Sequence, residues 1–288
     1  MDYIYLIGAA LLSAAMSVVN MAFKRRNWGA ENTSSFYNLL VSISAFVTWG
    51  VFFALDGSFD IRVILYSATY GIFYAMALIG LFKALEYGSA SLTSFIKQLS
   101  LIAVSIWGFI FWKTPLTVTV VIGLVLIVIA LYLCFKPDRN HAVKTSVKWV
   151  VFALLLLVGN AGCSIIQKYQ QAAFDTKYGS TLMFFGIGFA TIFCLAKYLK
   201  DKKPDFKMLS KSSLVLPVVS GISSALLNNF IILMLSTALS ESVIFPVIAV
   251  GGMILTTLFS VLVYKERLGK LEWAGLAVGA VALVFLNV

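Results

Sequence analysis

The sequence predicts an all-α membrane protein with ten transmembrane helices, arranged as two inverted repeats of five helices each. Three observations lead to this fold class. Hydrophobic residues make up 61% of the 288-residue chain and charged residues only 12%, well outside the range of soluble globular proteins. Apolar runs of about 20 residues, the length needed to cross a bilayer, recur along the chain. The two halves of the chain also resemble each other in sequence.

The apolar runs are separated by short polar breaks that leave no room for a soluble domain. Because the alternating pattern of barrel strands is absent, we expect each run to be a helix. The first run follows Met1 and Asp2 with no basic region or cleavage site, and it is expected to be a retained helix and not a signal peptide. The predicted spans are 3–23, 35–55, 61–85, 89–112, 116–135, 147–171, 178–199, 212–235, 239–264 and 270–287.

The formal net charge of +10 is concentrated in alternate loops. Basic residues cluster at 24–26, 136–148, 200–211 and 265–270, whereas the loops between these hold few. By the positive-inside rule the basic loops face the cytoplasm, which places both termini on the extracytoplasmic side of the cytoplasmic membrane. The excess charge therefore indicates contact with anionic membrane lipid and not with nucleic acid.

Two pairs of segments carry the internal similarity. The segment WKTPLTVTVVIGLVLIVIAL (112–131) aligns with YKERLGKLEWAGLAVGAVAL (264–283), and SAAMSVVN (13–20) aligns with NAGCSIIQ (160–167). A third, shorter match is the Ala-Leu pair that precedes the fourth helix of each half. Because all three matches occur in the same order, they indicate a duplicated unit.

The duplication divides the chain into residues 1–135, the first five-helix repeat, a basic cytoplasmic connector at 136–146, and 147–288, the second repeat. Since five is an odd number, the second repeat enters the membrane from the opposite side and the two repeats are inverted. Inverted repeats are typical of secondary transporters, in which the substrate site lies near the midplane where the halves meet.

The ten-helix, five-plus-five pattern resembles the drug/metabolite transporter superfamily, EamA type. Two further elements carry the resemblance: an Ala-Leu-x-Tyr turn at Ala84–Tyr87, and a Glu-Arg-Leu element followed by glycine at Glu266–Gly275. The resemblance covers nearly the whole chain. It implies a multi-pass permease that moves metabolites or drugs.

Polar residues recur at helical spacing within the apolar runs, and in a membrane helix they face the bundle interior. Such residues either hold helices together through hydrogen bonds or contact a solute. With Lys97, the candidate substrate-binding residues are Ser17, Asn20, Tyr37, Asn38, Tyr74, Ser94, Gln98, Asn160, Ser164, Gln167 and Asn228. Trp49 and Trp112, near the ends of predicted spans, are expected to be interface anchors.

Lys97 lies roughly 12 Å into a hydrocarbon core about 30 Å thick. A lysine at a helix centre costs about 2.5 to 3.5 kcal/mol on insertion scales, so it is expected to face water or an acceptor inside the bundle. No aspartate or glutamate lies deep in any predicted span. An anionic or zwitterionic ligand is therefore a natural partner. The alternatives are a structural lysine bonded to carbonyl and amide groups, and a lysine that relays protons.

We therefore expect a secondary transporter that moves a small polar organic solute, an anionic or zwitterionic metabolite such as an amino acid, by alternating access. Transport of a cationic solute (drug or choline-like) or a neutral one (sugar or nucleoside) is the alternative, and a non-transporting membrane scaffold is another. His141 is the single histidine and lies in a charged loop, so no catalytic residues, metal site or cofactor are expected. The expected partners are the solute and membrane lipid, with the chain a monomer or homodimer.

Overall fold

The computed structural model describes residues 2–26, 33–87, 90–113, 117–135, 146–204, 212–237, 239, 241–264 and 270–286. Within these residues the secondary structure is helical, with no strand. The helices are α1 (Asp2–Arg26), α2 (Thr33–Asp56), α3 (Val63–Tyr87), α4 (Ala90–Phe111), α5 (Val118–Phe135), α6 (Val147–Ala173), α7 (Gly179–Lys200), α8 (Ser212–Leu235), α9 (Glu241–Tyr264) and α10 (Lys270–Leu286). Each helix coincides with one predicted apolar run, which confirms the all-helical class.

Among the residues that the structure describes, six helices are long and apolar enough to cross a membrane. These segments are Tyr3–Phe23, Thr33–Asp56, Val63–Tyr87, Val147–Ala173, Gly179–Lys200 and Ser213–Leu235. The described parts of α4, α5, α9 and α10 contain shorter apolar stretches, at Ile102–Phe111, Val118–Ala130, Val243–Phe259 and Trp273–Ala282. The chain is thus a multi-pass membrane protein, and spanning by these last four helices remains a prediction.

Local sequence sets several helix ends. Ser146 caps α6, because its hydroxyl accepts a hydrogen bond from the Trp149 backbone N–H at 3.1 Å. After α2 the chain turns at Gly57, whose φ of +63° is a left-handed conformation that glycine adopts without a steric penalty. The bidentate pair between Asp60 and Arg62 (2.6 Å) then holds the short loop that leads into α3.

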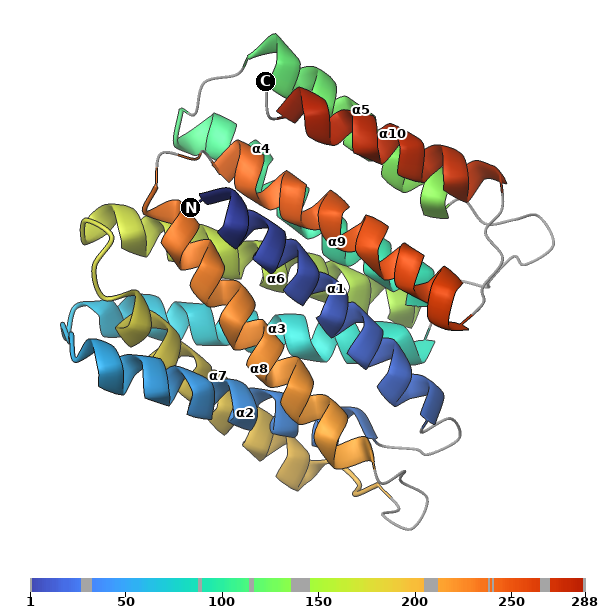
Figure 1. Ribbon diagram of the computed structural model, residues 1–288. Coiled ribbons are helices and arrows are strands. Elements are labelled where there is room, and N and C mark those ends of the chain that lie inside the picture. Colours follow the sequence, from blue (N-terminus) through green and yellow to red (C-terminus); the bar gives the residue numbers. More distant parts are fainter. Residues whose placement is uncertain are drawn as a thin grey trace.

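The helices pack mainly with partners from the other half of the chain (Figure 1). α3 packs against α6 and α7, while α1 packs against α8 and α9. α2 lies between α7 and α8, and α4 packs on both α6 and α9. α5 and α10 form a pair at one side of the bundle. The main packings map onto one another when α1–α5 are exchanged with α6–α10.

Small residues allow the closest of these helix crossings. A Cβ atom at Gly80 of α3 would lie 2.4 Å from the backbone nitrogen of Leu156 in α6, and one at Gly159 would lie 2.5 Å from that of Ala77. Such distances leave no room for a side chain at either glycine. The α3–α6 contact is therefore a backbone-to-backbone crossing of the kind that small residues permit in membranes.

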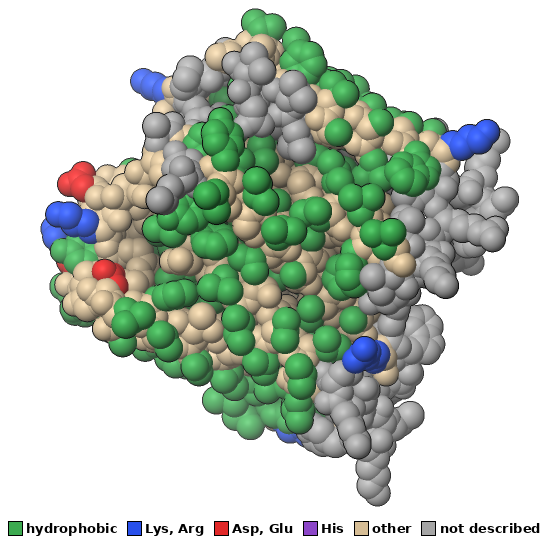
Figure 2. Space-filling model, viewed as in Figure 1, with side chains coloured by type: hydrophobic (Ala, Val, Ile, Leu, Met, Phe, Trp, Pro, Cys, Tyr) green, Lys and Arg blue, Asp and Glu red, His purple; other side chains and the backbone are tan. Residues whose placement is uncertain are grey.

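The outer surface is largely apolar, as expected for a bundle that faces lipid. Figure 2 shows hydrophobic side chains across the visible face, with lysine and arginine at its margins. Trp49 does not belong to this surface. Its side chain is 1% exposed and packs edge-on against Phe52, so the prediction of an interface anchor is wrong at this position. The side of α2 that carries Trp49 faces the bundle core, and this outweighs its place near a helix end.

Candidate functional site

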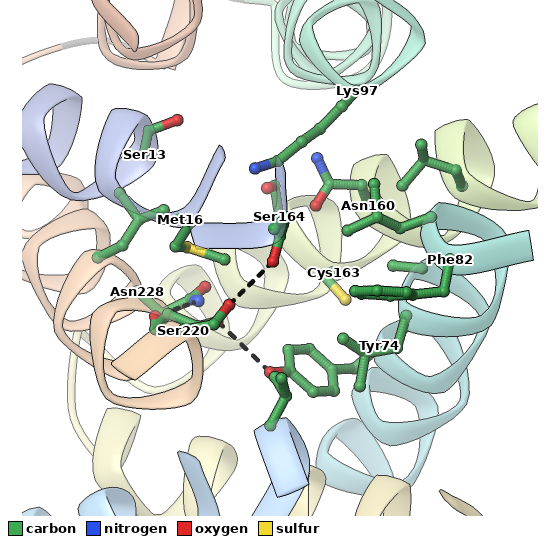
Figure 3. Close-up of a pocket in the computed structure, with 18 of the residues that line it drawn as sticks. Ser13, Met16, Tyr74, Phe82, Lys97, Asn160, Cys163, Ser164, Ser220 and Asn228 are labelled. Carbon is green, nitrogen blue, oxygen red and sulfur yellow. Dashed lines mark hydrogen bonds between the residues drawn. The ribbon is translucent and has the colours of Figure 1, made fainter. Parts of the chain in front are cut away.

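A cavity of about 100 Å³ lies inside the bundle (Figure 3). Its walls come from α1, α2, α3, α4, α6 and α8, with one residue of α9. Both halves of the chain therefore contribute to it. Many of the predicted site residues line the cavity: Asn20, Tyr37, Tyr74, Lys97, Asn160, Ser164 and Asn228.

Three other predicted site residues do not line the cavity. The hydroxyl of Ser17 donates back to the carbonyl of Ser13 within α1 at 3.1 Å. Asn38 is 3% exposed, and its Oδ1 atom has no hydrogen-bond partner among the described residues. Gln167 lies behind the wall, where it contacts a cavity residue, as described below. The side chains of Ser94 and Gln98 lie outside the described residues.

α8 presents three polar residues to the cavity, at successive turns of one helix face. Ser220, Ser224 and Asn228 follow at intervals of four residues, so the set spans roughly 12 Å along the helix axis. Each of the three side chains takes part in a hydrogen bond with a residue of another helix. The cavity wall is therefore organised in three levels along α8.

At the first level, Asn20 of α1 connects α2 and α8. The Tyr37 hydroxyl donates to Asn20 Oδ1 at 2.5 Å, and Ser220 Oγ donates to the same oxygen at 3.3 Å. All three side chains are buried. This level forms a closed polar layer at the end of the cavity that lies toward the C-terminal end of α1.

At the second and third levels α8 is joined to α3 and α6. Ser224 Oγ lies 3.4 Å from the Tyr74 hydroxyl. Asn228 Oδ1 accepts from Gln167 Nε2 at 3.0 Å and from the Tyr70 hydroxyl at 3.5 Å. The third level is a second polar layer, which we call the Asn228 layer and which consists of Asn228, Gln167 and Tyr70. It lies at the opposite end of the cavity from the first level, which we call the Asn20 layer. The cavity is bracketed by two layers of hydrogen-bonded side chains.

The α4 side of the cavity supplies its charge. Figure 3 shows the side chain of Lys97 extending from α4 toward Asn160 and Ser164 of α6. The Nζ atom of Lys97 is buried and has no hydrogen-bond partner among the described residues. Among the described residues that line the cavity, Lys97 is the one charged group. The described lining of the cavity therefore offers the lysine ammonium no carboxylate to neutralise it.

A chain of hydrogen bonds fixes the backbone around Lys97. Asn160 Nδ2 donates to Ser100 Oγ at 2.6 Å, and Ser100 Oγ donates to the carbonyl of Lys97 at 2.5 Å. These bonds tie α6 to the turn of α4 that carries the lysine. Because the Asn160 amide N–H is used in this way, its Oδ1 atom is oriented by the same bond.

The α2–α3 side of the cavity is aromatic. Tyr37 and Phe82 both line it, with ring centroids 4.1 Å apart. Phe23, which is 2% exposed, packs edge-on against Tyr37 at 4.3 Å. The cavity accordingly has an apolar aromatic wall, a polar wall on α1, α6 and α8, and a cation on α4.

A sequence model of the EamA-like transporter family matches residues 1–136. The matched residues, a little under half of the chain, are similar to this family. The resemblance inferred from the sequence is thereby confirmed over the first five helices. Together with the long apolar helices among the described residues, the match indicates a multi-pass membrane protein that is similar to transporters. Within the described residues, no cluster of three or more histidine, cysteine, aspartate or glutamate side chains could hold a metal ion.

Two other proteins are similar to this chain over nearly its whole length, including the part beyond residue 136. A Haemophilus influenzae protein (strain ATCC 51907 / DSM 11121 / KW20 / Rd), described as an uncharacterized protein, is 28% identical over 285 residues. The alignment covers 94% of this chain and 93% of that protein. A protein crystal structure superposes with a TM-score of 0.72 at 10% identity, over 99% of this chain and 95% of that one. This structural similarity shows the fold alone.

Several cavity residues were not among those predicted. Ser220 lines the wall on α8, and Phe82 and Cys163 line it on α3 and α6. Spacing alone could have indicated Ser220, because it precedes Asn228 by two helical turns. Phe82 and Cys163 are apolar residues within apolar helices, so no polar spacing pattern in the sequence marks them as cavity residues.

Proposed function

We propose that the protein is a secondary transporter that moves a small organic solute bearing one carboxylate, either a monoanion or a zwitterion such as an amino acid, by alternating access. The solute occupies the cavity with its carboxylate against Lys97. The observation that carries this proposal is the buried Lys97 ammonium, for which the described part of the chain supplies no hydrogen-bond partner.

An unpaired ammonium inside the bundle is costly, and the cost falls when an opposite charge binds. Insertion scales put a central lysine at about 2.5 to 3.5 kcal/mol. Since no aspartate or glutamate lies among the described residues that line the cavity, a bound carboxylate is the partner that this site lacks. The hydroxyl of Ser164 and the amide of Asn160 lie on the facing wall, where they can donate to or accept from the same solute.

The size and lining of the cavity narrow the solute further. The cavity volume is about 100 Å³. An engineered protein cavity that holds benzene has a volume of about 150 Å³, so this cavity suits a solute of only a few non-hydrogen atoms. A single cation suits one carboxylate, whereas a phosphate ester or dicarboxylate would leave charge unpaired in a site of low dielectric constant. The aromatic wall of Tyr37 and Phe82 suits an aliphatic portion or the ammonium of a zwitterion.

Alternating access rests on the proposed inverted repeats, residues 1–135 and 147–288 joined by the connector at 136–146. The exchange relation among the helix packings supports this division. The two polar layers that bracket the cavity also support it, because Asn20 of α1 and Gln167 of α6 occupy corresponding positions in the aligned repeats. Loop charge favours a cytoplasmic membrane location with extracytoplasmic termini.

A neutral solute is the second candidate, favoured by the hydroxyl and amide groups of the α8 levels. Such a solute would hydrogen-bond to Ser220, Ser224 and Asn228, and one of its own oxygen atoms would accept a hydrogen bond from Lys97. A cationic solute is disfavoured, because the lysine would repel it and no carboxylate among the described residues that line the cavity would attract it.

Purified protein in liposomes tests the proposal. We expect counterflow of a small amino acid or short monocarboxylate, and we expect Lys97→Met to abolish it while Lys97→Arg retains part of it. The matched control is Lys200→Met, which removes an exposed lysine at the end of α7. Normal counterflow of these anions by Lys97→Met would overturn the role of the lysine, and preferential flux of neutral or cationic solutes would overturn the solute class.

A further inference from the structure

Two hydrogen bonds between side chains join α2 to α7, one at each end of this antiparallel pair. Ser35, at the start of α2, donates to the carboxylate of Asp201, directly after α7. Ser180, at the start of α7, donates to the carboxylate of Asp56, the last residue of α2. In both pairs a serine from the first turn of one helix meets an aspartate that closes the other helix.

The two pairs are equivalent by position in the chain. Ser180 follows Ser35 at the same interval as Asp201 follows Asp56. Exchange of α2 with α7 therefore converts one pair into the other. Sequence similarity between the two helices is low, yet the same donor and acceptor occur at the same places, which points to a role that both repeats need. We call the pairs the Ser35–Asp201 latch and the Asp56–Ser180 latch.

Each latch lies close in sequence to one end of the cavity. Tyr37, in the Asn20 layer, follows Ser35 by two residues. Met183 follows Ser180 by three residues, and its sulfur accepts from Gln167 Nε2 at 3.4 Å, next to the Asn228 layer. Release of a latch therefore frees the helix turn that supports the adjoining layer.

The surroundings of the two latches differ. Lys197 Nζ lies 3.1 Å from Asp201 Oδ2 and partly neutralises that carboxylate. No cation among the described residues contacts the carboxylate of Asp56, which accepts a second hydrogen bond from Ser58 at 2.5 Å. Near the same end, Thr181 Oγ1 donates to the carbonyl of Ser58 at 2.6 Å. The ion pair lies within the end of α7 and orients the Asp201 carboxylate toward Ser35, whereas the Asp56 end has a second hydrogen bond across the seam, from Thr181.

We propose that these residues are gating residues for the transport step: each latch closes one end of the α2–α7 seam, and opening of the cavity to one side of the membrane breaks one latch while the other persists. This inference rests on the proposed alternating-access function.

Labelling of Cys163, which lines the cavity, tests the latches. The background is Cys134→Ala with Cys194→Ala, in vesicles of one orientation, with a membrane-impermeant methanethiosulfonate added to one side at a time. We expect Asp201→Asn and Ser35→Ala to raise the labelling rate at least threefold from the Asp201 side only, and Asp56→Asn and Ser180→Ala to do so from the opposite side only.

The control variant is Asp60→Asn, which removes an aspartate paired with Arg62 outside the seam and should leave both rates unchanged. Ser35→Thr and Ser180→Thr keep the hydroxyl and should restore slow labelling, which separates loss of the latch from a general folding defect. Unchanged rates in all latch variants, or equal increases from both sides, would overturn the latches.

The labelling measurement needs no solute, so the two proposals can fail separately. Normal solute counterflow that depends on Lys97, with no side-specific labelling, would overturn the latches alone. Side-specific labelling that follows the latches, with normal counterflow in Lys97→Met, would overturn the proposed solute site alone.

Discussion

The Tyr37 hydroxyl donates a 2.5 Å hydrogen bond to Asn20 Oδ1, which connects α2 to α1 inside the bundle. Tyr37→Phe removes this donor and leaves Asn20 Oδ1 with the longer bond from Ser220. Hydrogen bonds between membrane helices contribute about 1 kcal/mol, so we expect a loss of that order in the free energy of unfolding. Thermal unfolding in detergent measures it. Tyr66→Phe is the control, because its hydroxyl has no hydrogen bond among the described residues, and an equal loss in both variants would contradict the prediction.

The backbone crossing of α3 and α6 leads to a second prediction. In Gly159→Ala the new methyl group would lie 2.5 Å from the Ala77 backbone nitrogen and 2.7 Å from the Phe73 carbonyl oxygen. Backbone atoms cannot move aside alone, so the helices must separate, at a cost of about 1 to 3 kcal/mol. Gly50→Ala is the matched control, since its methyl would meet the ring of Phe184 at 3.4 Å, an ordinary contact. A lower melting temperature for Gly159→Ala alone is expected, and equal melting temperatures would be inconsistent with it.

The helices of this fold could be predicted from the sequence because burial in lipid leaves a local signal. Each apolar run of adequate length became a helix at its predicted position, as for 147–171 and the observed Val147–Ala173. Lys97 could also be predicted as a cavity residue, because a charged side chain within a membrane helix faces the bundle interior or a cavity and not the lipid. Both inferences depend on a single segment of the chain.

Features that depend on two distant segments could not be predicted. Ser220 is one of many small residues in α8, and only the packing of α1 beside α8 shows that it reaches Asn20. Trp49 lies near a helix end, yet the rotation of α2 about its axis turns the ring toward the core. Hydropathy reports the depth of a residue in the membrane better than it reports which neighbour the residue faces.

The third prediction concerns Asp201 and the dependence of folding stability on pH in the acid range. Partial burial alone would raise the pKa of this carboxyl, but the hydrogen bond from Ser35 and the ammonium of Lys197 outweigh burial and hold the pKa below its ordinary value of 3.8. Because the folded pKa is depressed, the ionised group stabilises the fold above the unfolded value, and this stabilisation is lost as the pH falls through the folded pKa.

Melting temperatures measured from pH 7 down to pH 3 test this expectation. The difference in melting temperature between the original protein and Asp201→Asn should be largest near pH 7 and should shrink below about pH 4. Lys197→Met removes the cation that lowers the pKa, so its loss of stability should begin at a higher pH. A difference that stays constant across this range would show that ionisation of Asp201 does not contribute.

The shared position of Cys163 and Lys97 on the cavity wall gives a fourth prediction, which concerns the charge of molecules that enter. In the Cys134→Ala, Cys194→Ala background, an anionic sulfonate-bearing methanethiosulfonate should label Cys163 faster than a cationic ammonium-bearing reagent of similar size. The lysine concentrates anions and repels cations in a site of low dielectric constant. Lys97→Met should abolish the preference, whereas the exposed-site control Lys200→Met should preserve it. A preference for the cationic reagent, or one unaffected by Lys97→Met, would show that this lysine does not set the cavity's charge selectivity.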